Sequence, residues 1–184
     1  MLCISCAADR VRPYFMALPT HIDPRKLALQ GYLLEGEVAI ESLPRLQSAV
    51  VEVVGQVLAS VQFELDEARA KIALGVVEAK VGVICQRCLD KVQIDLKAHF
   101  AVQVIWSEEH ESRVAKNYEP WLVLDKLANL SELLEDEILL SLPLVNYHAS
   151  GECTGDTFET KKISDDNGTV EDGPFSILSQ LKRR

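Results

Sequence analysis

Two cysteines separated by two residues, Cys85 and Cys88, carry the most specific chemical signal in the sequence. A Cys-x-x-Cys pair that opens a helix after a strand is typical of thiol–disulfide chemistry, whereas the same pair at the tip of a hairpin is typical of a zinc knuckle. Alternating apolar residues precede and follow this pair. The flanking sequence therefore favours the knuckle.

A metal site with four ligands needs two further donors, and His148 and Cys153 are the candidates. Structural zinc prefers four tetrahedral ligands, and thiolates together with an imidazole meet that preference. Both residues follow Pro143 closely enough to fold back as a unit onto the hairpin tip. The sequence thus predicts Cys85, Cys88, His148 and Cys153 as ligands, with zinc as the candidate metal.

Two other uses of the cysteines have less support. A thiol oxidoreductase would use Cys85 as nucleophile and Cys88 as resolving thiol. Such enzymes usually lower the thiol pKa at a helix N-terminus, but the segment after Cys88 alternates like a strand. A zinc ribbon that includes Cys3 and Cys6 would need a much shorter interval to the second pair than this chain has.

Period-two patterning surrounds the cysteine pair. Apolar residues occupy every second position over residues 92–106, alternate again over 79–83, and do so a third time over 51–65, before the charged turn at 66–71. This pattern predicts strands that bury one face. We therefore expect an α+β fold, mainly an antiparallel sheet, with the cysteine pair at a hairpin tip.

A helix is predicted near residues 130–142, packed on the sheet. Asn129 suits the N-cap, and Glu132 completes a capping-box pattern. Glu135 and Asp136 fall in the early turns, where the helix dipole favours acidic residues. Leucine and isoleucine recur on one helical face, and Pro143 ends the helix.

The C-terminal part of the chain has a different composition. Residues 154–173 are rich in Gly, Asp and Asn, which predicts a flexible acidic linker. Residues 174–184 then predict a short helix with a basic end, which would dock either on its own chain or on a partner through three apolar side chains: Phe175, Leu178 and Leu181. We expect the preceding part of the chain, to residue 153, to form a single domain.

Composition narrows the class of protein. The chain has 184 residues, 48% of them hydrophobic, and no run approaches the ~18 apolar residues of a membrane span. Its odd number of cysteines, 5, argues against a secreted disulfide framework. We therefore expect a cytoplasmic protein without a membrane partner.

Charge is distributed unevenly along the chain. The net charge is −9, and residues 125–172 hold 12 acidic against 3 basic side chains. The broad basic stripe typical of proteins that bind nucleic acid is not visible. An acidic surface instead suits contact with a basic protein.

The sequence lacks the signatures of common enzymes. It contains no phosphate-binding loop, no Gly-x-Gly-x-x-Gly pattern, no His-Glu-x-x-His motif and no nucleophile elbow. We therefore expect neither catalysis nor a small-molecule substrate.

Several short motifs occur in a recognisable order: Pro19 to Asp23 with Pro24 and Gln30-Gly31, Cys85-Gln-Arg-Cys88, Tyr118-Glu-Pro120, Glu135-Asp-Glu-Ile-Leu-Leu-Ser-Leu-Pro143, His148 to Cys153, and Pro174-Phe175 with Leu178 to Lys182. In this combination the chain resembles the bacterial YceD family, known as large ribosomal RNA subunit accumulation proteins, from about Met16 to its C-terminus. The resemblance implies a role in the synthesis, processing or stability of 23S ribosomal RNA. Family members also often carry a cysteine or histidine and then a second cysteine after the Leu-Pro motif, as this chain does.

The resemblance leads to expectations about partners and about the start of translation. Direct contact with 23S rRNA or its precursor would use Arg87 and Lys91 at the hairpin tip and Lys97 on the exposed strand face. Alternatively, the chain acts through a large-subunit assembly protein, as an adaptor that binds a basic protein. Family members typically begin a few residues before the equivalent of Leu18-Pro19, which implies a start at Met16. Residues 1–15 would then be a mis-annotated or disordered N-terminal extension, and residues 16–153 the single domain.

Overall fold

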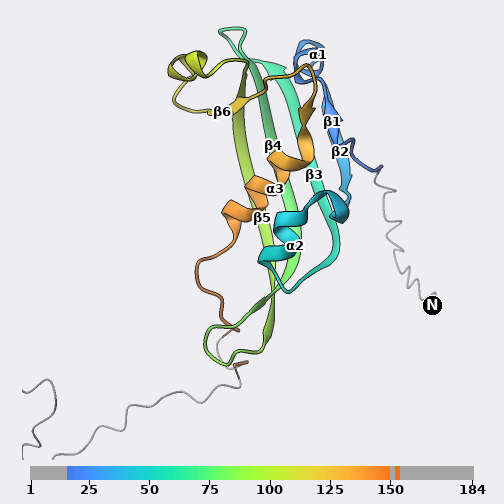
Figure 1. The fold of residues 1–184 in the computed structure, drawn as a ribbon, viewed down its shortest axis with the longest axis vertical. Helices are drawn as coiled ribbons and strands as arrows, with labels where there is room; N and C mark the ends of the chain where they lie inside the picture. Colours follow the sequence, from blue (N-terminus) through green and yellow to red (C-terminus); the bar gives the residue numbers. More distant parts are fainter. Residues whose placement is uncertain (1–15, 150–151, 154–184) are drawn as a thin grey trace, which may run out of the picture.

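A curved sheet of five strands forms the body of the computed structural model, which describes residues 16–149 and 152–153 (Figure 1). The sheet order follows the sequence: β2 (Leu33–Val38), β3 (Glu52–Leu65), β4 (Lys71–Ile84), β5 (Lys91–Ile105) and β6 (Glu119–Leu122). Neighbouring strands are antiparallel except β5 and β6, which are parallel. The predicted α+β fold with a mainly antiparallel sheet is therefore confirmed.

The hairpin of β4 and β5 is long and extends past the helices at the lower end of the molecule in Figure 1. Its pairing runs without interruption from Ile72 opposite Gln103 to Ile84 opposite Lys91. Ala79, Val81 and Val83 are buried, as the alternation predicts. This hairpin carries the cysteine pair at its tip.

Gly75 of β4 lies directly opposite Phe100 of β5. A Cβ atom built on Gly75 would lie 2.1 Å from the Phe100 ring, so the ring occupies the space that any other side chain would need. Phe100 itself is buried. The glycine thus allows the ring to pack into the core across the strand.

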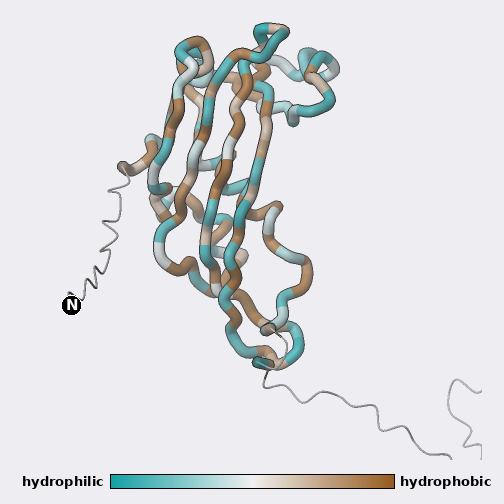
Figure 2. Tube along the Cα trace, turned by 180° about the vertical axis from the view of Figure 1, so that it is seen from behind, coloured by the Kyte–Doolittle hydropathy of each residue, from teal (hydrophilic) through white to brown (hydrophobic). Residues whose placement is uncertain are grey.

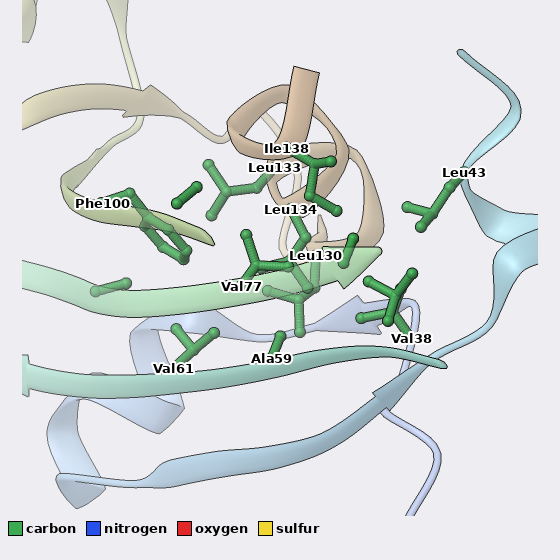
Figure 3. Close-up of a cluster of buried hydrophobic side chains, with 14 of the residues drawn as sticks. Val38, Leu43, Ala59, Val61, Val77, Phe100, Leu130, Leu133, Leu134 and Ile138 are labelled. Carbon is green, nitrogen blue, oxygen red and sulfur yellow. The ribbon is translucent and has the colours of Figure 1, made fainter. Parts of the chain in front are cut away.

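One face of the sheet is covered by helices. These are α1 (Pro24–Gln30), α2 (Pro44–Ala49) and α3 (Leu130–Ser141), and Figure 3 shows α3 side chains packed against sheet residues such as Val77. Leu130, Leu134 and Ile138 are almost fully buried there. From the other side the strands are seen directly, with hydrophilic and hydrophobic positions intermixed along them (Figure 2).

The predicted helix near 130–142 is confirmed as α3, which ends at Ser141. Asn129 is its N-cap, and its side-chain oxygen accepts a hydrogen bond from the Glu132 N–H at 3.2 Å. A two-residue ladder between β1 (His21–Ile22) and β7 (Ala128–Asn129) fixes the start of the helix.

Short elements complete the described part of the chain: the 3₁₀ turns η1 (Ile40–Ser42) and η2 (Glu108–Arg113). No helix among the described residues combines the length and hydrophobicity needed to cross a membrane. The expected N-terminal extension (1–15), acidic linker (154–173) and C-terminal helix (174–184) lie outside the described residues, so these and the boundaries of the 16–153 domain remain predictions.

Candidate metal centre

The turn between β4 and β5 holds the two cysteines of the pair. Across this turn the Cys85 N–H donates to the Asp90 carbonyl at 2.9 Å, and the Leu89 N–H donates to the Cys85 carbonyl at 3.0 Å. Leu89 adopts a left-handed conformation with φ 65°. The turn is thus tight and internally bonded, and it presents both sulfur atoms to one side of the tip.

The loop that follows α3 returns along the molecule to this turn (Figure 1). Gln86 binds the loop twice: its N–H donates to the Asn146 carbonyl at 2.8 Å, and its side-chain amide donates to the Leu144 carbonyl at 3.3 Å. These bonds fix the loop against the hairpin tip. They bring His148, and after it Cys153, beside the cysteine pair.

Four ligand atoms converge there, from Cys85, Cys88, His148 and Cys153, and all lie within 4.8 Å of one another. The Cys88 sulfur is 3.3 Å from His148 Nδ1, and the sulfurs of Cys85 and Cys153 are 3.9 Å apart. Zinc bonds of about 2.3 Å to sulfur and about 2.0 Å to nitrogen place tetrahedral ligands roughly 3.6–3.8 Å apart. The four donors could therefore hold a metal ion, and the two separations given above lie near those of a tetrahedral site.

His148 is oriented by a hydrogen bond on the far side of its ring. Its Nε2 lies 3.2 Å from the Lys91 carbonyl, so in the neutral ring Nε2 carries the proton and donates. In this neutral form the lone pair resides on Nδ1, which faces the Cys88 sulfur, whereas in the protonated ring Nδ1 carries a proton that it can donate to the neighbouring sulfurs. A backbone carbonyl that holds the second ring nitrogen is the usual partner of a metal-binding histidine.

The surroundings of Cys85 favour its thiolate form. Burial raises the pKa of Cys85, but hydrogen bonds from the backbone N–H groups of Cys88 and Arg87, and from the backbone and side chain of His148, outweigh burial and lower this pKa to about 5. Hydrogen bonding to Cys85 raises the pKa of His148. Burial, and then the neighbouring sulfurs, raise the pKa of Cys88. A divalent cation would displace the protons that these groups retain.

The burial of the cysteines bears on the redox alternative. Cys85 has no exposed surface, whereas Cys88 and Cys153 are partly buried. A buried sulfur cannot approach the disulfide of another protein, and the chain after Cys88 enters a strand rather than a helix. The geometry supports metal binding better than thiol exchange.

The predicted RNA-contact cations have different surroundings. Lys91 forms an ion pair with Glu52 at 2.8 Å, and Lys97 pairs with Glu78 at 2.6 Å. Arg87 instead lies over the ring of Tyr147, 5.2 Å from its centroid. Of these three cations, Arg87 is the one that lies over an aromatic ring. The predicted contacts Phe175, Leu178 and Leu181 lie outside the described residues.

Three residues at the tip were not predicted from the sequence. Gln86 and Asn146 join the loop to the turn, and Tyr147, with 51% of its surface exposed, supports Arg87. Gln86 lies within the Cys-x-x-Cys motif, and Asn146 and Tyr147 immediately precede a predicted ligand, His148. Their position in the sequence, next to predicted ligands, was therefore the one signal that could have identified these three residues.

Comparisons with known proteins agree with the motifs. The family model described as "Large ribosomal RNA subunit accumulation protein YceD" matches residues 74–182, a stretch that includes all four residues of the cluster. A Haemophilus influenzae protein with the same name is 26% identical over 170 residues, which cover 91% of this chain and 97% of the relative. No solved structure gives a significant match.

Proposed function

This chain belongs to the YceD family of large ribosomal RNA subunit accumulation proteins, and we propose that it maintains the level of 23S ribosomal RNA during assembly of the large subunit, without catalysing a reaction. The match of the family model to residues 74–182 carries this proposal. The similarity to the Haemophilus influenzae protein over 91% of the chain supports it. We place this role in the cytoplasm, with 23S rRNA or an assembly protein as the partner.

The metal centre has a structural role in this proposal. Cys85 and Cys88 on the hairpin tip, together with His148 and Cys153 beyond α3, would hold one zinc ion. Zinc bound by four protein ligands supplies a cross-link and no open position for a substrate. Such a cross-link would stabilise the tip, which extends beyond the helices (Figure 1).

Among the three predicted cations, Arg87, together with Tyr147, is the RNA contact that the geometry supports best. A tyrosine ring with 51% exposure and a guanidinium 5.2 Å from its centroid offer two flat surfaces on which an unpaired base can stack. Lys91 begins the strand on the other side of the turn, where a phosphate would compete with Glu52 for its ammonium group. Lys97 lies away from the tip and is already paired, so it contributes less.

An adaptor for a basic protein is the second candidate function. Three carboxylates near α3, those of Glu119, Glu132 and Glu137, form no ion pair within the part of the chain that the structure describes. Such a surface favours a basic partner through charge complementarity. The two candidates differ at the tip, because only direct RNA contact requires Arg87.

The ratio of 23S to 16S rRNA in cells depleted of this protein tests the proposed role. We expect the ratio to fall on depletion and to recover with a plasmid copy of the full chain. A copy that begins at Met16 should restore it equally if residues 1–15 are dispensable. An unchanged ratio in depleted cells would contradict the proposed function.

A further inference from the structure

A groove runs between the free edge of β6 and one side of α3. It consists of two adjoining cavities of about 480 Å³ and 360 Å³, which share Trp121, Leu133 and Asp136 in their linings. Pro120 of β6 lies at its edge and has no N–H to offer another strand. The groove is thus shaped for side chains rather than for an added β-strand.

Leucine side chains are exposed along this groove. Leu124 and Leu140 each have 76% of their surface exposed, and Leu127 has 53%. Leu124 and Leu127 line the larger cavity and Leu140 the smaller one. Clustered exposed leucines of this kind mark a surface that another segment covers.

Carboxylates surround the same groove. Glu119 and Glu137 line the smaller cavity, and Asp125 and Glu132 line the larger one. None of the four forms an ion pair among the described residues. Partial burial, followed by repulsion from Glu119 and Asp136, raises the pKa of Glu137. An occupant that carries positive charge would relieve this repulsion.

We propose that residues 174–184 of the same chain dock in this groove. The segment offers Phe175, Leu178 and Leu181 at helical spacing for the leucine-lined cavities. It ends in Lys182, Arg183 and Arg184, whose charge is opposite to that of the surrounding carboxylates. The apolar side chains of the segment therefore match the leucines of the groove, and its positive charge matches the carboxylates around the groove.

The length of chain beyond Cys153 permits this docking. Leu140 in the groove and Cys153 are joined by a segment that spans at most about 45 Å, even if fully extended. A chain of the length from Cys153 to Phe175 could reach about 70 Å if fully extended, and a random coil of that length has an end-to-end distance of about 25 Å. A tether of this kind gives a millimolar-range effective concentration, so even a weak contact becomes populated.

A second apolar groove, beside the hairpin tip, is the main competing location. It is a cavity of about 480 Å³ lined by residues that include Val51, Ile84 and Leu89. The described residues that line this cavity include no carboxylate, so the basic end of the segment would find no opposite charge there. Charge therefore favours the groove between β6 and α3.

Photo-crosslinking in the purified full chain tests the proposal. Phe175 is replaced by p-benzoylphenylalanine, the protein is irradiated at low micromolar concentration, and the crosslinked peptides are mapped. We expect crosslinks within one chain to residues 119–140, with a yield about tenfold above that of the same photoprobe at Thr169, a difference of about 1.4 kcal/mol.

Matched variants establish whether the groove itself is responsible. Leu140→Glu should reduce the crosslink about tenfold, whereas Leu144→Glu, at a leucine that is 96% exposed and lies outside the groove, should leave it unchanged. Crosslinks at residues 49–51 or 83–89, crosslinks between two chains, or a yield equal to that of the Thr169 probe would each overturn the proposal. The measurement needs no ribosome, so its failure leaves the proposed role in rRNA accumulation intact.

Discussion

Glu135 of α3 accepts a hydrogen bond from the backbone N–H of Leu46, in the first turn of α2, at 3.0 Å. Its other oxygen accepts from Arg45 Nε at 2.8 Å, and only 3% of Glu135 is exposed. Leu43 immediately precedes α2 and offers no side-chain cap. The carboxylate on a distant helix thus caps α2 and joins the two helices.

Removal of this carboxylate should destabilise the fold. We expect Glu135→Ala to lower the free energy of unfolding by about 2–4 kcal/mol, because it leaves the buried Leu46 N–H unpaired and removes one of the two carboxylates that bind Arg45. Glu135→Gln keeps an oxygen for Leu46 and should cost about 1–2 kcal/mol. Urea denaturation measures both, with the half-exposed Asp136→Asn as the control at under about 1 kcal/mol. Equal effects of Glu135→Ala and Asp136→Asn would contradict the capping role.

This cap shows where sequence patterns stop being informative. The alternation in β4 and β5 and the Asn129 cap were sufficient to place two strands and α3, because these signals are local. In the sequence, Glu135 fits equally well as an acidic residue favoured by the helix dipole. Its partner lies 89 positions away, and only the packing of α2 against α3 makes it a buried cap.

Local sequence patterns were likewise insufficient to predict the short helices and the ion pair of Lys97. α1 has an Asp23 cap, Pro24 and a left-handed Gly31, but its 7 residues are too few for a clear period. Lys97 was predicted as an RNA contact on the exposed strand face, and the strand register places it directly opposite Glu78, with which it forms an ion pair. Register depends on the whole hairpin, so the ion pair could not be read from either strand alone.

Gly75 should tolerate no side chain. Gly75→Ala forces the Phe100 ring to move, because the new Cβ would lie 2.1 Å from it, and we expect a loss of about 1–3 kcal/mol in unfolding free energy. Gly82→Ala on the same strand is the control, since the nearest atom there is the Glu52 Cγ, in a flexible side chain. Thermal denaturation should show a lower Tm for the first variant alone. A similar Tm for the two variants would show that the ring position is not constrained.

Zinc should co-purify with the protein at about one ion per chain, as measured by elemental mass spectrometry. Cys85→Ser and Cys88→Ser should each abolish that stoichiometry and lower the Tm, because metal-binding energy contributes to folding. Cys3→Ser and Cys6→Ser, at cysteines that are not among the four predicted ligands, serve as controls and should retain the metal. Full stability of Cys85→Ser and Cys88→Ser, with no metal in the unaltered protein, would exclude a structural zinc site.

Glu137 should make the stability of the fold depend on pH. Burial, and then repulsion from Glu119 and Asp136, raise its pKa in the folded protein, so the folded chain binds more protons than the unfolded one. Its contribution is therefore most favourable below the ordinary glutamate pKa of about 4.3 and is lost as pH rises through the higher folded value.

Glu137→Gln should accordingly stabilise the protein at pH 7, and its advantage over the unaltered chain should vanish as the pH falls toward 4. Urea denaturation at several pH values measures this difference. Glu67→Gln, on the exposed turn between β3 and β4, controls for the removal of one negative charge. A constant difference between Glu137→Gln and the unaltered chain across the pH range would contradict the raised pKa.

Arg87 and Tyr147 should control RNA contact if the hairpin tip binds RNA directly. Stacking on an aromatic side chain is worth about 1–3 kcal/mol per base, so Tyr147→Ala should weaken binding of a single-stranded 23S fragment by roughly 10- to 100-fold. Arg87→Glu should abolish ultraviolet crosslinking in cells, because it removes the guanidinium over the ring and repels phosphate. Lys97→Glu, at a lysine already paired with Glu78, is the charge-matched control and should change crosslinking much less. If crosslinking survives in Arg87→Glu while the 23S level still falls on depletion, the tip is not the RNA site, and the basic-protein adaptor becomes the better explanation.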